Sequence, residues 1–282
     1  MNGELQQRSS AACTPDCSHG SPATHMLRAA HDRIDLWITS CGNIEESLID
    51  QYRYVMSGDE QHKAARFRFE CDRRRYIVTR ALVRTVLCRY VPRAPTALRF
   101  TTNAYGRPEI ANEGEVERSL SFNVSHSSDR ILLGVTRENA LGVDIEAVAP
   151  ARVALDVAHR CFSARELAAL MALPPASQVQ RFFEYWTLKE SYVKAVGMGL
   201  SLPLDSFSFD LCERRGIRFS SSASEQVASW RFWDFRPITG FIAAVCVRSN
   251  TPIQQVLSFR SVVPLRGERP LSCAIDRQSY VT

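Results

Sequence analysis

Apolar and polar residues alternate over several short stretches of the chain, which is the pattern of half-buried β-strands. The stretches form two groups. The first comprises ALRFTT (97–102), SLSFNVSHS (119–127), RILLGVT (130–136) and LGVDIEAV (141–148), and IDLWIT (34–39) is a separate short strand ahead of it. The second comprises DSFSFDL (205–211), WRFWDF (230–235) and GFIAAVCV (240–247). The short spacings within the first group, up to residue 148, predict an antiparallel meander.

Helical signals precede each group of strands. Ser57 is a cap residue for a helix through DEQHKAARFRF, and a second helix is predicted through DRRRYIVTRALVRTVLCRYV, ending at Pro92. Ser163 and Glu166 in SARE form a capping box for a third helix. A fourth helix, rich in aromatic residues, is predicted from about 177 to 196.

Helices followed by strands therefore occur twice, and this order predicts an α+β protein of two similar halves. We expect an N-terminal half over 31–148 and a C-terminal half over 149–250, joined near 147–152. Residues 1–30 are rich in Ser, Pro, Gly, Cys and His, which predicts a flexible extension. Residues 251–282 form a tail without a periodicity that predicts any element.

The composition excludes several classes of protein. The chain has 282 residues, 45% of them hydrophobic, which is enough to build a sizeable core. No stretch reaches the roughly 20 apolar residues of a membrane-spanning helix, and the N-terminus lacks the apolar segment of a signal peptide. The nine cysteines contain no C-x-x-C pair, which favours the reducing cytoplasm. Cys13, Cys17 and His19 lie close together, but a zinc site there would need a fourth ligand.

The net charge of +5 fits an acidic partner or an anionic ligand, and it is equally typical of an ordinary soluble protein. The excess is concentrated in residues 60–90, which contain nine Lys or Arg and three acids. No recognised nucleic-acid module accompanies this basic run, so a small phosphate-bearing ligand is favoured over nucleic acid. Arginine suits bidentate contacts to phosphate.

LGVDIEAV carries two carboxylates on a predicted strand. Because side chains at i and i+2 share one face of a strand, Asp144 and Glu146 point one way and Val143 and Ile145 the other. Such a pair is common at a solvent-facing strand. It is also half of a site for Mg²⁺, which typically takes one or two carboxylates together with waters and phosphates. Glu190 could supply a third oxygen from the second half.

The aromatic helix carries charged residues near its apolar face. At about 100° per residue from Phe182, Glu190 falls at about 80°, beside Phe183, and Lys194 falls at the rim of the apolar arc. Glu190 and Lys194 are four residues apart, so an ordinary helix ion pair is one interpretation. A carboxylate on an aromatic face is costly to bury alone, which indicates a cationic group nearby.

FNVSHSSD places His126 between two serines at the end of a strand, where a lone histidine is more often structural than catalytic. A Ser–His–Asp hydrolase built from Ser125, His126 and Asp144 is an alternative. It is disfavoured because neighbouring residues of a strand point to opposite faces. The chain also lacks the G-x-S-x-G elbow of many such hydrolases.

Four stretches resemble, in this order, the Sfp-type 4′-phosphopantetheinyl transferases: YGRPEI, FNVSHS, GVDIE and YWTLKESYVKAVGMGLSLPLDSF. Each is modest alone, but W-x-x-K-E-S-x-x-K-x-x-G-x-G-L downstream of G-V-D-I-E is a highly specific combination. The resemblance covers roughly residues 33–247. It implies a pseudo-twofold arrangement of two α+β halves, each with a small antiparallel sheet packed on helices, and an active site in the cleft between them.

The resemblance also implies a reaction. Such an enzyme binds coenzyme A and Mg²⁺ and transfers 4′-phosphopantetheine to a serine of an apo acyl or peptidyl carrier protein, releasing adenosine 3′,5′-bisphosphate. The metal ligands would be Asp144, Glu146 and Glu190, and Glu190 is alternatively the base on the carrier serine. Lys194 would contact the pyrophosphate and assist the leaving group.

The residues that the resemblance places against coenzyme A are Lys63, Arg75, Arg107, Ser125, His126, Asp144 and Lys194. Among them, Lys63, Arg75 and His126 would hold the 3′-phosphate. Two positions depart from the family pattern: Arg107 stands where lysine is frequent, and Glu60 where a further base is expected. GMGLSLPL would form a turn close to the site, since its glycines permit close approach of the backbone.

Alternatives stay open beside the transferase. One is a catalytically silent module that binds coenzyme A or a carrier protein on the same fold; the complete set of metal-site residues argues against it. The other is the serine hydrolase. A chain of two halves needs no second subunit to build its cleft, which favours a monomer, without membrane or nucleic-acid partners. The sequence does not identify the carrier protein, its pathway or the tolerance for acyl-coenzyme A.

Overall fold

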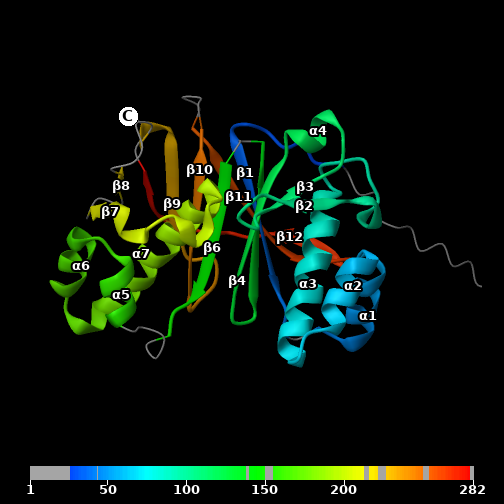
Figure 1. Ribbon diagram of the computed structural model, residues 1–282, viewed down its shortest axis with the longest axis horizontal. Coiled ribbons are helices and arrows are strands. Elements are labelled where there is room, and N and C mark those ends of the chain that lie inside the picture. The colour runs from blue at the N-terminus through cyan, green and yellow to red at the C-terminus, as the bar shows by residue number, and fades with distance from the viewer. Residues whose placement is uncertain are drawn as a thin grey trace, which may run out of the picture.

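The computed structural model describes residues 26–42, 44–137, 140–149, 155–212, 216–221, 227–249 and 254–279. Two groups of helices lie at opposite sides of the molecule, and strands fill the space between them (Figure 1). Helices α1 to α3 form one group and α5 to α7 the other. The molecule therefore has two halves, each with its own sheet and its own helices.

The first half contains a five-stranded sheet in the order β12-β11-β1-β5-β4. Its strands are β1 (Arg33–Ser40), β4 (Ser121–Ser127), β5 (Arg130–Thr136), β11 (Val256–Val263) and β12 (Gly267–Pro270). Its helices are α1 (Glu46–Tyr54), α2 (Gly58–Ala65), α3 (Glu70–Leu87) and α4 (Glu115–Arg118). A separate hairpin joins β2 (Phe100–Thr102) to β3 (Pro108–Ile110).

The second half contains a six-stranded sheet in the order β6-β10-β9-β13-β8-β7. In chain order its strands are β6 (Ala140–Ala147), β7 (Phe207–Cys212), β8 (Gly216–Ser221), β9 (Trp230–Phe235), β10 (Phe241–Arg248) and β13 (Ile275–Ser279). Its helices are α5 (Leu155–Cys161), α6 (Ala164–Met171) and α7 (Pro175–Val196). α7 is the aromatic helix expected from the sequence.

The expected α+β fold of two halves, with sheets packed on helices, is confirmed. Two details differ. β1 pairs with β11 in parallel, and so does β13 with β8, so that each sheet is mixed rather than purely antiparallel. The predicted meander ends after β4 and β5, because β6 pairs with β10 of the second sheet.

The division near residue 148 does not follow the sheets. β6 precedes this position, yet it is an edge strand of the second sheet. The 251–282 tail contributes β11 and β12 to the first sheet and β13 to the second, and thereby links the two halves. β11 is hard to predict because its sequence, VLSFRSVV, mixes polar and apolar residues and has only Phe259 and Val262 buried. Sequence reasoning also missed α1, α5 and β8.

Apolar side chains join the two sheets into one core. The residues of β1 and β6 in this shared core are Ile34, Leu36, Ile38, Leu141, Val143 and Ile145. The period of two that they follow is the one expected for strands. The intervening residues of β6, Gly142 and Asp144, face α7. The predicted separation of the apolar face of β6 from its carboxylate face is therefore confirmed.

α7 lies directly on β6 because Gly142 has no side chain. A Cβ atom at Gly142 would lie 1.9 Å from the carbonyl oxygen of Ser191 and 2.5 Å from the amide nitrogen of Ala195. The helix ends at Gly197, whose φ of 75° is a left-handed conformation that glycine adopts without strain. The glycine in GVDIE thus brings residues 191–195 of α7 onto the carboxylate face of β6.

Both predicted capping boxes are present. At the start of α2, the Ser57 side chain accepts from the Glu60 amide, and the Glu60 carboxylate accepts from the Ser57 amide. Ser163 and Glu166 exchange the same two bonds at the start of α6. These bonds satisfy amide groups that have no partner inside a helix.

In the part of the chain that the structure describes, no helix combines the length and the hydrophobicity that crossing a membrane requires. The zinc hypothesis on Cys13, Cys17 and His19 lies outside the described residues. Of the predicted N-terminal extension, 1–30, the structure describes only residues 26–30.

Candidate active site

A cavity of about 480 Å³ lies between the two halves. The first half lines it with the β2–β3 hairpin around Arg107 and with β4 around Val124. The second half lines it with Glu190 and Lys194 of α7, and with the segment 197–204 that follows this helix. The cavity thus has mostly apolar walls, with one acid and one base side by side on α7.

Lys194 connects the two halves at this cavity. Its ammonium group donates to Asp144 Oδ1 at 2.6 Å and to Ser125 Oγ at 2.9 Å. Ser125 donates to the same oxygen of Asp144 at 2.8 Å. Asp144 is 3% exposed, and its other oxygen, Oδ2, is buried without a hydrogen-bond partner among the described residues. Because a buried carboxylate oxygen without a partner is costly, Oδ2 is suited to bind a cation.

Side chains of β4 take the place of a backbone ladder between β4 and β6. Asn123 Oδ1 accepts the Val143 N–H at 2.9 Å, and Ser127 Oγ accepts the Ala147 N–H at 3.1 Å. Ser127 also donates to Glu146 Oε2 at 2.6 Å. Since alternate residues share one face of a strand, β4 presents its polar side chains together to β6. This contact fixes the carboxylates of β6 relative to the first half.

Three carboxylates make the region beside Lys194 electronegative. Burial raises the pKa of Glu190, the charges of Asp144 and Glu146 raise it further, and Lys194 opposes the shift. Among the described residues, no three His, Cys, Asp or Glu side chains form a group that could ligate one metal ion. Asp144 is bonded to Lys194 instead. Mg²⁺ typically takes only one or two protein carboxylates, so a metal site on Asp144 and Glu146 stays a prediction.

The chain is similar to known transferases over most of its length. The 4'-phosphopantetheinyl transferase superfamily matches residues 140–246, and the family described as 4'-phosphopantetheinyl transferase, N-terminal, matches residues 45–137. The 4'-phosphopantetheinyl transferase HetI of Nostoc sp. is 30% identical over 226 residues, which are 80% of this chain and 92% of HetI. The 4'-phosphopantetheinyl transferase Sfp of Bacillus subtilis is 31% identical over 70% of this chain and 84% of its own.

The chain belongs to the Sfp-type 4′-phosphopantetheinyl transferase family. It is therefore an enzyme of the transferase class, as its motifs indicate. The two family matches fall on the two sides of the cavity, one mainly in the first half and one in the second. Both relatives carry the name of the active transferase, so the catalytically silent alternative gains no support.

Among solved structures, the holo-[acyl-carrier-protein] synthase of Helicobacter pylori in complex with coenzyme A covers 39% of this chain and 99% of its own. The TM-score is 0.30 and the sequence identity 22%, which is too distant for a comparison of individual residues.

In this transferase, Arg107 lines the cavity, but its guanidinium is bonded to the protein. It donates to the carbonyl oxygens of Ala195 at 2.8 Å and Leu141 at 3.2 Å. Asn103 of the same hairpin donates to the Gly197 carbonyl at 3.0 Å. The last carbonyl groups of a helix lack internal donors and carry partial negative charge. The hairpin of the first half therefore caps α7 of the second, and the contact of Arg107 with a cofactor stays a prediction.

The three residues expected at the 3′-phosphate lie outside the cavity lining. Lys63 is exposed, and its Nζ lies 5.5 Å from the ring centre of Tyr76, beside a second cavity of about 490 Å³. Arg75 pairs with Asp72, one turn earlier on α3. Partial desolvation, followed by the charge of Arg75, lowers the pKa of His126, so Arg75 and His126 lie near each other. The charge of Arg75 thus acts on His126, whereas Lys63 lies at the second cavity.

Carboxylates neutralise most of the basic run on α2 and α3. Glu60, which departs from the family pattern, accepts from Arg80 and Arg84 at 2.7 Å each. Arg84 is 1% exposed and also donates to the carbonyl oxygens of Pro95 and Leu98. Further ion pairs of this run are Arg73 with Glu70, Arg74 with Glu46, Arg75 with Asp72 and Arg89 with Glu268. Most of the basic residues counted in 60–90 are thus paired with carboxylates of the protein itself.

The serine hydrolase alternative lacks its catalytic pair. Ser125 is buried and bonded to Asp144 and Lys194, whereas His126 is exposed on the other face of β4. Within the described residues, no hydrogen bond joins Ser125 to His126. The predicted opposite orientation of these neighbours is therefore confirmed.

Sequence reasoning missed several residues of this region. Asn123 and Ser127 flank Ser125 at a spacing of two, and this spacing was the available signal that all three face β6. Cys161 of α5 lines the cavity, and its sequence context gives no such signal. Lys189 belongs to the same motif as Glu190 and Lys194, yet it lies outside the cavity lining.

Proposed function

We propose that this enzyme transfers the 4′-phosphopantetheine arm of coenzyme A to a serine of an apo acyl or peptidyl carrier protein. The serine oxygen bonds to the phosphorus that carries the pantetheine. The bond from this phosphorus to the oxygen shared with the second phosphate breaks, and adenosine 3′,5′-bisphosphate leaves with the electron pair. The serine proton passes to a base. The nucleophile comes from the partner, so the chain needs no nucleophile of its own.

The observation that carries this proposal is that Lys194, held by Asp144 and Ser125, lines one cavity together with Glu190. Phosphoryl transfer depends on positioning and on neutralising the charge of the phosphates more than on covalent chemistry of the protein. The Lys194 side chain is 27% exposed, so its ammonium can contact a diphosphate in the cavity while Asp144 and Ser125 hold it in place. Lys194 would then stabilise the charge on the leaving oxygen.

The proposed metal is Mg²⁺, with Asp144 and Glu146 as ligands and Glu190 as a third that would have to move closer, because the three do not form one ligand group among the described residues. The unpartnered Oδ2 of Asp144 and the electronegative surroundings of Glu190 support this set. When bound, the ion would neutralise negative charge on the diphosphate. Glu190 makes no hydrogen bond within the described residues, so its carboxylate is available either as the third ligand or as the base that accepts the serine proton.

The adenosine end of coenzyme A would lie toward the first half. Arg75 and His126 would hold the 3′-phosphate, and their proximity supports this role. Lys63 would contribute from α2 if the cofactor extends to the second cavity. Arg107 would meet the cofactor at the cavity wall, although its present bonds are to carbonyl groups.

We further propose that the enzyme works as a monomer in the cytoplasm. Both halves of a single chain line the cavity, so a second copy has no residue to supply there. The described cysteines that the structure assigns are free thiols: Cys41, Cys71, Cys88, Cys161, Cys246 and Cys273. Free thiols are typical of a reducing compartment.

The test is incubation of the protein with coenzyme A, Mg²⁺ and a panel of apo carrier proteins, followed by mass spectrometry of the carriers. We expect at least one carrier to gain the mass of one phosphopantetheine arm, with adenosine 3′,5′-bisphosphate released in equal amount. EDTA should stop the reaction. No mass gain on fatty-acid, polyketide or peptide carriers would contradict the proposal, and modification that persists in EDTA would remove the metal from it.

A further inference from the structure

Lys189 stands directly before Glu190, but its side chain is 0% exposed. Lysine is rarely buried completely, because an unpaired ammonium group is costly to remove from water. Here each of its three N–H groups has an acceptor. These are Glu166 Oε2 at 2.8 Å and the carbonyl oxygens of Leu204 at 2.7 Å and Phe207 at 2.9 Å. The burial of Lys189 is therefore fully compensated.

Glu166, the partner of Lys189, is also 0% exposed. Its Oε2 accepts from the backbone amide and the hydroxyl of Ser163, which closes the capping box of α6. Its Oε1 accepts the Phe209 N–H of β7 at 2.9 Å. The pair thus connects α6, α7 and the chain that enters β7.

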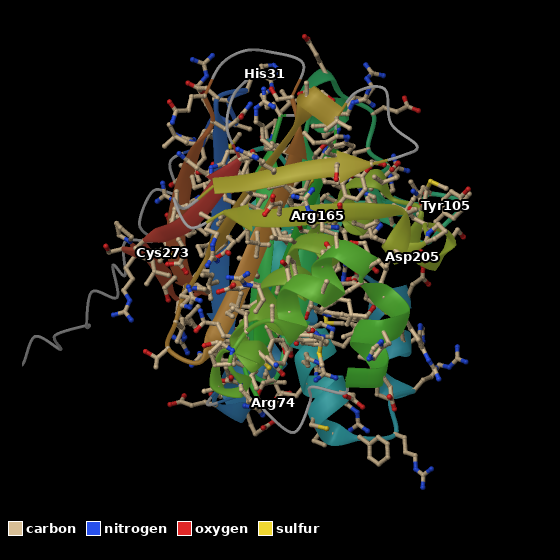
Figure 2. All side chains as sticks on the ribbon, turned by 90° about the vertical axis from the view of Figure 1, so that its left-hand side faces the viewer. His31, Arg74, Tyr105, Arg165, Asp205 and Cys273 are labelled. Atoms are coloured by element: carbon tan, nitrogen blue, oxygen red, sulfur yellow. The ribbon has the colours of Figure 1, made fainter. Side chains whose placement is uncertain are left out.

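The segment that Lys189 holds is a wall of the cavity. Residues 202–204 line the cavity, and the carbonyl groups of Leu204 and Phe207 lie at the two ends of a short 3-10 helix, Leu204–Ser206. Figure 2 shows Asp205 of this segment on the same side of the molecule as Tyr105 of the β2–β3 hairpin, which also lines the cavity. Backbone bonds within the segment, such as Ser206 to Pro203, are local. Leu202 and Leu204 pack against the buried core, and Lys189 adds hydrogen bonds that tie the backbone of the segment to α7.

We propose that Lys189 is a positioning residue of the transferase. By holding the carbonyl groups of Leu204 and Phe207, it fixes the wall against which coenzyme A binds. This inference rests on the proposed function, which places coenzyme A in the cavity. α7 then serves the site on two faces, with Glu190 and Lys194 at the cavity and Lys189 beneath the wall. An apolar side chain at 189 would leave two buried carbonyl groups without donors, which is costly.

The experiment combines Lys189→Met with Glu166→Gln. The double change leaves no buried charge without a partner, which a single change would do. Methionine keeps the length of the side chain, and glutamine keeps an acceptor for the capping box. The matched control is Arg165→Met, at the position of α6 directly before Glu166. Arg165 is 70% exposed and pairs with Asp210 of β7 at 2.7 Å. It is labelled in Figure 2.

Two measurements test whether Lys189 holds the wall segment in place. In hydrogen exchange without substrate, we expect the amides of 202–207 to exchange about tenfold faster in the double variant than in the control. In carrier modification, we expect KM for coenzyme A to rise about tenfold while kcat stays within about threefold, since the wall contributes binding and not chemistry. A general loss of folded protein would lower apparent kcat instead.

Each outcome decides the inference. Exchange and KM equal to those of the control would overturn it. A double variant that does not fold would also contradict it, because the pair would then serve the fold and not the wall. If the wild type and the control both modify no carrier, the proposed function fails. The exchange of 202–207 then still decides whether Lys189 holds this segment.

Discussion

The β6–α7 region and the helices α2 and α3 use charged residues differently. On β6 and α7, the side chains of Asp144, Glu190 and Lys194 come from distant parts of the sequence, and one buried oxygen of Asp144 has no partner among the described residues. In residues 60–90, nine Lys or Arg stand against three acids, but Arg80 and Arg84 of α3 both pair with Glu60 of α2. The basic charge of α2 and α3 therefore stabilises the fold, whereas the charge of the β6–α7 region is available to a ligand. Charged residues on one face of a strand or helix therefore predict a ligand site better than the net charge of a sequence segment does.

The largest effect is expected from Glu190→Gln on the β6–α7 side. Glutamine keeps the size of the side chain but neither accepts a proton nor neutralises a metal, so the transfer rate should fall about 10³-fold. Burial and neighbouring acids raise the pKa of Glu190, so removal of its charge should leave the unfolding temperature unchanged or higher. The check is kcat for carrier modification beside thermal unfolding. A near-normal kcat would move the reaction away from α7.

Lys194→Ala should have the next largest effect. Loss of the ammonium group removes the cation closest to the proposed diphosphate, which predicts a fall of about 10²-fold in kcat. The fold should remain intact because Ser125 still donates to Asp144, although the loss of the cation should lower its stability. Arg165→Ala, which removes an exposed cation from α6, serves as the control and should retain full activity. Unchanged kinetics would reduce Lys194 to an ion-pair partner of Asp144.

Glu60→Gln tests the opposite side through stability. Burial opposes ionisation of Glu60, but the hydrogen bond from Arg84 and the charge of Arg80 outweigh it and lower the pKa of Glu60. The variant should lose about 2 kcal/mol of unfolding free energy at neutral pH. A lowered pKa gives stability that is present above the unfolded value of about 4.3 and lost as the pH falls through the folded pKa.

The difference in stability between wild type and Glu60→Gln should therefore shrink below about pH 4. Denaturant unfolding across the pH range measures it. A difference that does not depend on pH would mean that the carboxylate contributes by packing alone. A large loss of transfer activity at neutral pH would mean that Glu60 acts in the site after all.

Arg75→Ala should have the smallest effect. Arg75 is partly exposed and already paired with Asp72, so one phosphate contact is worth about 1 kcal/mol there, or about fivefold in KM for coenzyme A. Arg73→Ala on the same helix removes a similar pair with Glu70 and should leave KM unchanged. Equal effects of the two variants would show that the basic helix contributes only general charge.

The strands and helices around the site could be predicted because their patterns are local. The period of two placed Asp144 and Glu146 on one face of β6, and the structure has this arrangement. The capping box at Ser163 marked the start of α6, and Gly197 marked the end of α7. Each of these signals depends on residues within one or two turns of the element itself.

The remaining features depend on contacts between distant segments. No local pattern shows that β6 pairs with β10, or that β11 and β13 of the tail enter different sheets. The motif containing Lys189 and Glu190 does not show which of the two charges is buried, because the partner of Lys189 lies on α6. Likewise, the ion pair of Arg84 with Glu60 links α3 to α2, so no pattern within either helix predicts it.

Mass spectrometry of a carrier protein with the wild type, Asp144→Ala and Asp210→Ala tests the β6–α7 group most directly. Asp210 also forms an ion pair with a basic residue of a helix, but it lies outside the cavity lining, so it is the matched control. We predict full modification by the wild type and by Asp210→Ala, and none by a folded Asp144→Ala under the same conditions with coenzyme A and Mg²⁺. Equal modification by all three proteins would contradict the assignment of the transfer site to Asp144 and its neighbours.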